Sequence, residues 1–295
     1  MTRPDGSATT VREHAGVMTH NSYGKSRVRL TKVTRHKDRH EFKEILVDIQ
    51  LEGDFDPCYI EGDNKLVVAT DSMRNTIYVL AANHALEDIE SFGKTVAEHF
   101  VKTYEQVRMC TVHLAEELWQ RITVDGKPHT HAFVGASDEK HSAAAIATAE
   151  LTKIESGIDG LRLVKTTDSE FWGFVRDKYT TLPEVKDRIF GTAASVHWQY
   201  QSDPLHYQRA YDDVRKAVLE VFATHHSLGV QHTIYEIGQV ALERVPEISE
   251  ITITMPNEHR IVFNLQPLGL ENKNEVFVTT DEPFGLISAT IKRQG

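Results

Sequence analysis

The sequence contains only two cysteines, Cys58 and Cys110, and neither belongs to a Cys-x-x-Cys pair. This scarcity argues against a disulfide framework and a cysteine-based zinc or redox site, and it fits a reducing cytoplasm. No apolar run approaches the roughly 20 residues that span a bilayer, and the N-terminus lacks the apolar core of a signal peptide. We therefore predict a cytoplasmic protein that has no membrane partner.

Basic residues are also in the minority, because 33 Lys and Arg stand against 43 Asp and Glu, for a net charge of -10. Proteins that follow the phosphates of nucleic acids are usually strongly basic, so we expect no nucleic-acid partner. The sequence has no glycine-rich phosphate loop and no Rossmann fingerprint. Its 295 residues predict about two domains of roughly 150 residues each.

Sixteen histidines are present, and the pairs His129/His131 and His225/His226 suggest a metal site. Residues two apart in a strand share a face, so His129 and His131 could contact one cation. However, no Glu or Cys at a familiar ligand spacing accompanies either pair. We therefore predict that the protein has no metal site.

Hydrophobic patterning divides the chain into a leader and two similar halves. Residues 1–21 have no periodicity and predict a disordered, mobile leader. The first half, 22–148, predicts the order strand, strand, helix, strand, strand, with the helix over 89–104 and a hairpin turn at Asp125-Gly126. The second half, 149–295, predicts a similar order around a long amphipathic helix that begins at Tyr207.

In the second half, a turn is expected at Asp159-Gly160 and a tight connection at 255–259. Strands are expected over 149–156, 161–166, 230–245, 248–254 and 260–268. Thr70-Asp71-Ser72 aligns with Thr167-Asp168-Ser169, and each is expected to lead into a helical segment, which indicates a repeat. The pattern predicts an α+β fold in which each half is an antiparallel sheet with helices on one face. The uncovered face then needs a partner, so we expect association.

The stretch 161–188 joins a short strand, a Thr-Asp-Ser turn, an aromatic cluster and Arg188. On spacing alone, it fits a helix whose aromatic residues pack into the core and an arginine in a surface ion pair. The stretch also resembles the signature segment of urate oxidase (uricase), an enzyme family that oxidises urate with molecular oxygen. The residues that carry this resemblance are Lys165, Thr167, Ser169, Phe171, Phe174, Tyr179, Leu182 and Arg188.

Four more segments match the uricase pattern, so that the resemblance extends from Tyr23 to about Lys292. They are Tyr23-Gly24-Lys25, Val68 to Thr76, Gly229-Val230-Gln231 and Pro256-Asn257-Glu258-His259. Taken alone, each has a simpler interpretation: a solvated lysine, a helix cap made by Asp71 or Ser72, polar surface at the start of a strand, and a surface imidazole after a turn.

The resemblance implies specific roles for nine residues. Lys25, Thr70 and His259 are expected to form a catalytic proton relay. The substrate-binding residues are expected to be Asp71, Phe171, Arg188, Val230, Gln231 and Asn257. Arg188 and Gln231 would hold opposite ends of the purine, Phe171 would stack on its face, the Asp71 backbone would contact it, and Asn257 would hold oxygen or water above the ring.

The resemblance also implies two tandem tunnelling-fold (T-fold) units that assemble into a homotetramer, closing a barrel with active sites between subunits. The expected reaction converts urate, O2 and water to 5-hydroxyisourate and hydrogen peroxide without a cofactor. The final residues Arg293-Gln294-Gly295 are unlike the Ser-Lys-Leu peroxisomal address of many eukaryotic members, which suggests a bacterial cytoplasmic origin.

Two alternatives remain open at the level of sequence. One is a non-catalytic purine-binding module, and the other is a metal-dependent pterin or purine hydrolase on the same T-fold scaffold. The sequence also leaves open whether Leu182 and Ile287 line the pocket.

Overall fold

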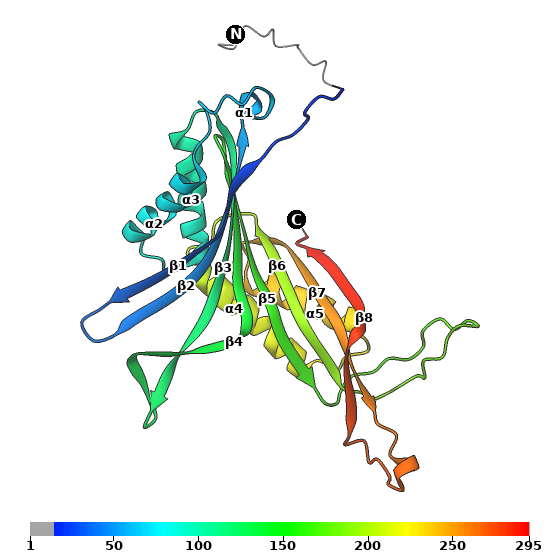
Figure 1. The fold of residues 1–295 in the computed structure, drawn as a ribbon. Helices are drawn as coiled ribbons and strands as arrows, with labels where there is room; N and C mark the ends of the chain where they lie inside the picture. The colour runs from blue at the N-terminus through cyan, green and yellow to red at the C-terminus, as the bar shows by residue number, and fades with distance from the viewer. Residues whose placement is uncertain (1–14, 295) are drawn as a thin grey trace.

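A single antiparallel sheet of eight strands forms the framework of the computed structural model, which describes residues 15–294. The strands lie side by side in the order in which they occur in the chain (Figure 1). They are β1 (Tyr23–Arg35), β2 (His40–Gly53), β3 (Val107–Val124), β4 (Lys127–Thr148), β5 (Thr152–Lys165), β6 (Phe190–Tyr200), β7 (Ile248–Val262) and β8 (Phe277–Lys292). Residues 1–14 of the predicted leader lie outside the described part, and 15–21 form no helix or strand.

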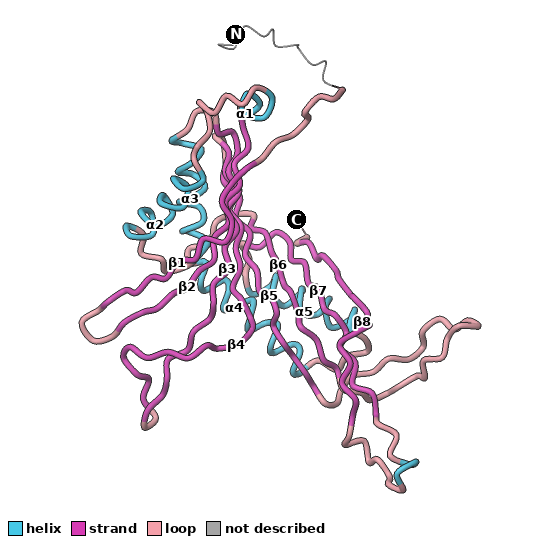
Figure 2. Tube along the Cα trace, in the orientation of Figure 1, coloured by secondary structure: helices cyan, strands magenta, loops and turns pink. Residues whose placement is uncertain are grey.

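Helices are inserted between the strands at two corresponding points of the chain. Between β2 and β3 lie α1 (Asp56–Ile60), α2 (Thr70–Asn83) and α3 (Ile89–Thr103); between β6 and β7 lie α4 (Tyr207–Thr224) and α5 (Val230–Arg244). A short 3-10 helix, Gln266–Leu268, precedes β8. Figure 2 distinguishes the helices from the continuous sheet by colour. The apolar faces of α2 to α5 pack against one side of this sheet.

The alternation of apolar and polar residues explains which face the helices cover. In β2, the side chains of Ile45, Val47, Ile49 and Leu51 are buried, whereas those between them are only partly buried. Because successive strand residues point to opposite faces, this pattern gives one apolar face and one polar face. The apolar face packs against the helices in two clusters, one around Phe92 of α3 and one around Trp198 of β6. The predicted α+β fold, with helices on one face of an antiparallel sheet, is confirmed.

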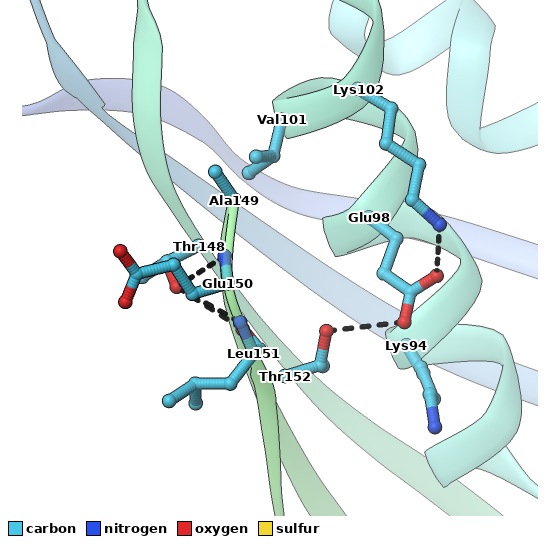
Figure 3. Close-up of a pocket in the computed structure, with 9 residues that line it drawn as sticks. All are labelled: Lys94, Glu98, Val101, Lys102, Thr148, Ala149, Glu150, Leu151 and Thr152. Carbon is cyan, nitrogen blue, oxygen red and sulfur yellow. Dashed lines mark hydrogen bonds and ion pairs between the residues drawn. The ribbon is translucent and has the colours of Figure 1, made fainter.

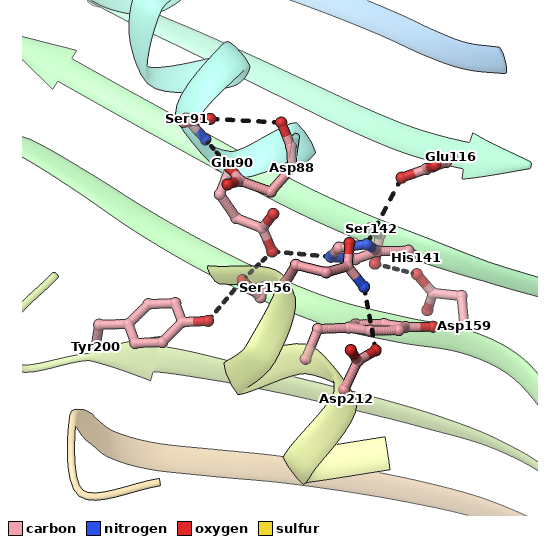
Figure 4. A network of polar contacts seen from close by, with 12 residues as sticks. Asp88, Glu90, Ser91, Glu116, His141, Ser142, Ser156, Asp159, Tyr200 and Asp212 are labelled. Atoms are coloured by element: carbon pink, nitrogen blue, oxygen red, sulfur yellow. Dashed lines mark hydrogen bonds and ion pairs between the residues drawn. The ribbon is translucent and has the colours of Figure 1, made fainter. Parts of the chain in front are cut away.

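A buried polar network lies where α3 and α4 approach the sheet (Figure 4). His141 of β4 is 1% exposed, and its Nε2 lies 2.8 Å from Oε1 of Glu90, which is fully buried on α3. The same carboxylate accepts a 2.5 Å hydrogen bond from Ser156, and the Tyr211 ring stacks on His141 at 3.9 Å between centroids. Burial alone would raise the pKa of Glu90, but the charge and hydrogen bond of His141 and the bond from Ser156 lower it below its ordinary value.

Several local predictions are confirmed. The strands around Val28 and Ile45, the helix from Ile89, the turn at Asp125-Gly126 and the helix from Tyr207 all occur as expected. The strand expected from Ile248 also occurs, as β7.

Four predictions in the second half are wrong. The predicted strand 230–245 is helix α5, because its buried residues recur every three or four positions: Val230, Thr233, Ile234, Ile237, Gly238, Ala241 and Leu242. The predicted turn at Asp159-Gly160 is instead an irregularity inside β5, where pairing with β6 shifts between Ile158 and Leu161 and Gly160 adopts φ +70°. The predicted connection 255–259 lies within β7, which continues to Val262. The separate strand expected over 260–268 therefore does not form, and Gln266–Leu268 is a 3-10 helix.

The helical segment expected after Thr167-Asp168-Ser169 is the fourth error. Residues 166–189 contain no helix; Gly173 has a positive φ and Phe171 forms an isolated bridge with Val185. The side chains of Trp172 and Tyr179 are 51% and 77% exposed instead of packing into a core. Strand β6, which follows this segment, was not predicted.

Candidate active site

A cavity of about 710 Å³ lies between the 166–189 segment, the start of α5, and strands β7 and β8. Six of the nine predicted site residues line it: Phe171, Arg188, Val230, Gln231, Asn257 and His259. Leu182 and Ile287 line it as well, which answers the question that the sequence left open. The structure therefore brings together residues from four separate stretches of the chain.

Arg188 supplies the positive charge of this cavity. Its Nη1 donates to Oδ1 of Asn257 at 3.5 Å, while its buried Nε has no hydrogen-bond partner. Burial lowers the pKa of the guanidinium from its ordinary value. Among the side chains that the structure describes, Arg188 makes no ion pair with a carboxylate, so the surface ion pair that spacing alone suggested is absent there and an anion could occupy this position.

Phe171 lies beside this guanidinium, whose Cζ is 5.8 Å from the centre of the ring. The position of Phe171 is set by paired backbone hydrogen bonds with Val185, of 2.8 and 3.0 Å. A second ring, Phe174, stacks on Phe171 with centroids 4.9 Å apart. The arrangement gives the cavity a flat aromatic surface next to its cation.

The N-terminus of α5 forms another part of the wall. Val230 and Gln231 are the first two residues of this helix, not of a strand as predicted. The N-cap, Gly229, provides no side-chain cap, so N–H groups of the first turn remain available to a ligand. These groups and the helix dipole favour an anion at this end.

Strand β7 contributes Asn257 and His259, with an irregularity between them in the pairing with β8. Glu258 and Arg260 also line the cavity, although the sequence analysis did not select them. These two side chains pair with each other at 3.0 Å. Their charges therefore largely compensate each other, which leaves Arg188 and its neighbour Asp187 as the other charged side chains of the described lining.

Lys25, Thr70 and Asp71 do not line this cavity. Lys25 lies on β1, and Thr70 and Asp71 begin α2. The N-cap of α2 is Ala69 and no side chain caps it, so the predicted cap by Asp71 or Ser72 is wrong. The Asp71 carboxylate instead pairs with Arg74 at 2.6 Å.

One tyrosine joins the two segments that carry Lys25 and Thr70. The Tyr23 hydroxyl accepts a 2.8 Å hydrogen bond from the Val68 N–H and lies 3.3 Å from the Val68 carbonyl, to which it donates. Tyr23 is two residues from Lys25, and Val68 is two residues from Thr70, so this contact holds the two segments together. The signal for Tyr23 in the sequence is the Tyr23-Gly24-Lys25 motif, in which the resemblance gives a role to the lysine alone.

Other surface features fit the predicted site less well. A cavity of about 390 Å³ between α3 and the β4–β5 turn contains none of the nine residues, and Glu98 there accepts hydrogen bonds from Lys102 and Thr152 (Figure 3). Across residues 15–294, no group of three or more His, Cys, Asp and Glu side chains is arranged to hold a metal ion. Among the described helices, none combines the length and apolar character needed to cross a membrane.

Comparison with known families agrees with this geometry. A family model described as uricase matches residues 21–146 and 154–288. The chain belongs to the uricase family. The predicted family and the prediction of an oxidoreductase of this class are confirmed.

Individual uricases are similar over almost their whole length. The uricase of Arthrobacter globiformis is 42% identical over 95% of this chain and 91% of its own length, and that of Oryctolagus cuniculus is 36% identical over 97% and 98%. The crystal structure of the Arthrobacter globiformis uricase has a TM-score of 0.90, at 41% identity over 96% of both chains. The uricase fold of tandem T-fold units is therefore confirmed for this chain.

Proposed function

We propose that the protein is a cofactor-independent urate oxidase that converts urate, O2 and water to 5-hydroxyisourate and hydrogen peroxide in purine catabolism. The main support is the cavity around Arg188, in which a half-buried guanidinium without an ion-pair partner among the described side chains lies beside an aromatic ring and a helix N-terminus that no side chain caps. This combination suits a flat, anionic heterocycle.

The proposed binding mode follows from the chemistry of each wall. The Arg188 fork binds the anionic edge of urate, and the Gln231 amide binds the opposite edge as donor and acceptor. Phe171 stacks on the ring and Val230 contributes apolar contact. Asn257, which already bonds Arg188, holds oxygen or water above the ring.

Catalysis in this proposal consists of proton movement and positioning. Deprotonated urate is electron-rich enough to give an electron to O2, so the protein has to bind the anion, move protons and hold O2 nearby. Lys25, Thr70 and His259 form the proton relay, and the Asp71 backbone contacts the purine. No flavin or metal takes part in these steps.

We infer that the site is completed by a second subunit, because Lys25, Thr70 and Asp71 lie outside the cavity that holds the other six residues. The assembly proposed is a cytoplasmic homotetramer whose sheets close into a barrel, built from T-fold units over 22–148 and 149–295. The exposed Trp172 and Tyr179 support burial against another chain, since large exposed aromatics often mark interfaces.

The deciding experiment mixes chelator-treated, flavin-free protein with urate in air-saturated buffer and follows oxygen uptake and peroxide. We expect one peroxide for each urate and each O2 consumed, without an added metal or flavin. Binding of urate without turnover would point to a non-catalytic purine-binding module. Hydrolysis of a purine or pterin that requires zinc and is indifferent to oxygen would identify a metal-dependent hydrolase. Either result would reject the proposal.

A further inference from the structure

Two parts of the cavity wall are joined at one fully buried residue, Ser227. Its backbone N–H donates to the Asp168 carbonyl at 2.9 Å, and its carbonyl accepts from the Glu170 N–H at 2.7 Å. These bonds hold the strand-like segment that continues into Phe171. Arg188 joins the same segment, because its backbone N–H donates to the Ser169 carbonyl at 2.9 Å.

The hydroxyl of Ser227 reaches in the other direction, to the start of α5. It donates to the Gly229 carbonyl at 3.1 Å and accepts a 2.8 Å hydrogen bond from the Thr233 hydroxyl, which is also fully buried. Gly229 has no side chain with which to cap α5. The start of the helix is instead fixed by the Ser227 hydroxyl, which precedes the helix, together with the Thr233 hydroxyl in its first turn. A Cβ at Gly229 would lie 3.5 Å from the Gln231 amide oxygen and 3.9 Å from the Phe171 ring, which shows how closely the two walls approach there.

We propose that the Ser227 hydroxyl is a positioning group for substrate. On the proposed function, Phe171 and Arg188 bind one side of urate and Val230 and Gln231 bind another. The backbone of Ser227 anchors the first pair, while its hydroxyl, held by Thr233, anchors the second. The hydroxyl thereby sets the separation between the two walls without touching the ligand.

Ser169 provides a matched control. It pairs with Ser227 in an isolated parallel bridge and is equally buried, but its hydroxyl has no hydrogen-bond partner. Ser169→Ala and Ser227→Ala therefore remove the same atom from adjoining sites, yet only the second loses hydrogen bonds.

The test measures binding of urate under anaerobic conditions, together with KM, kcat and the thermal midpoint. We expect Ser227→Ala to weaken binding and raise KM about tenfold, or about 1.4 kcal/mol, with kcat within roughly twofold of wild type. Ser169→Ala should bind as wild type. Thr233→Val should weaken urate binding as Ser227→Ala does, and Thr233→Ser should restore it, because only serine keeps the hydroxyl. If Ser227→Ala does not fold, the two Thr233 variants still test the positioning role.

Equal binding by the two serine variants, or a lower thermal midpoint with unchanged binding, would overturn the positioning role while leaving the proposed function intact. Failure of Thr233→Ser to restore binding would also overturn it. If wild-type protein bound no urate without oxygen, the proposed function itself would fail, and the inference that rests on it would fail with it.

Discussion

Replacing His141 by Phe should strongly destabilise the protein, because it leaves the buried Glu90 carboxylate without its imidazole partner. The Nε2 atom of His141 and Oε1 of Glu90 are 2.8 Å apart, a distance that for two full charges would correspond to an attraction of about 6 kcal/mol at an effective dielectric constant of about 20. Desolvation offsets much of this attraction, and removal of one partner from a buried pair typically costs about 3–5 kcal/mol. Phe retains an aromatic ring against Tyr211, so the change acts mainly on charge and hydrogen bonding.

The double variant Glu90→Leu/His141→Phe separates charge from packing. Removing both partners leaves no unpaired ion, and apolar replacement of a buried pair is often nearly neutral. At about 2 °C per kcal/mol for a chain of this size, the single variant should lower the thermal midpoint by roughly 6–10 °C, and the double variant should recover most of that loss. The midpoints are compared by circular dichroism at equal protein concentration, since assembly shifts them. Equal losses in both variants, or no loss in the single one, would refute the reasoning.

Three further predictions follow from named contacts. The difference in unfolding free energy between wild type and His141→Phe should shrink as the pH falls below about 4.5. The pKa of Glu90 is lowered in the folded state, so its ionised form stabilises the protein fully above its ordinary pKa of 4.5 and progressively less below it. A difference that stays constant during acid unfolding would contradict the pairing. Arg188→Ala should weaken urate binding roughly 10- to 150-fold in a titration, whereas Lys25→Ala should mainly reduce kcat; an equal effect on binding would exclude these separate roles. Tyr23→Phe should reduce kcat with little change in KM. The control Tyr78→Phe breaks a similar 2.9 Å bond, from α2 to the Arg29 carbonyl of β1, and should leave kcat unchanged. Matching losses of kcat in steady-state kinetics would mean that both tyrosines only stabilise the fold.

The sequence predicted those elements whose buried residues follow a single period. The alternation from Ile45 to Leu51 gives β2, and the three- and four-residue spacing from Tyr207 gives α4. Helix α5 was misread because Val230, Ile234 and Ile237 are β-branched and favour strands by propensity, although their spacing is helical. Tertiary packing against β7 and β8 decided in favour of the helix.

Errors around the site have a different origin. Pro256 breaks the strand pattern of the sequence, yet β7 continues through it. No residue between Thr254 and Glu258 pairs with β6, so the missing N–H is tolerated there. Segment 166–189 has aromatic residues at helical intervals but no core in its own chain to receive them. The local sequence pattern therefore could not predict the irregular backbone of this segment.

The composition of the site could not be predicted from spacing. Arg188 and Asn257 are 69 positions apart and meet only through the fold, so only the family resemblance assigned both of them to one site. The same resemblance does not select Ser227 or Tyr23 for a role, since their importance lies in hydrogen bonds that have no pattern in sequence.

The agreement between strand order and chain order bears on how the polypeptide reaches this structure. Every strand from β2 to β8 pairs with the one synthesised immediately before it, so a growing chain on the ribosome can extend the sheet one strand at a time. No strand has to pair with one that is distant in the order of synthesis. The loops that close when each strand pairs are therefore short relative to the chain. Translation and sheet assembly can thus proceed in the same direction.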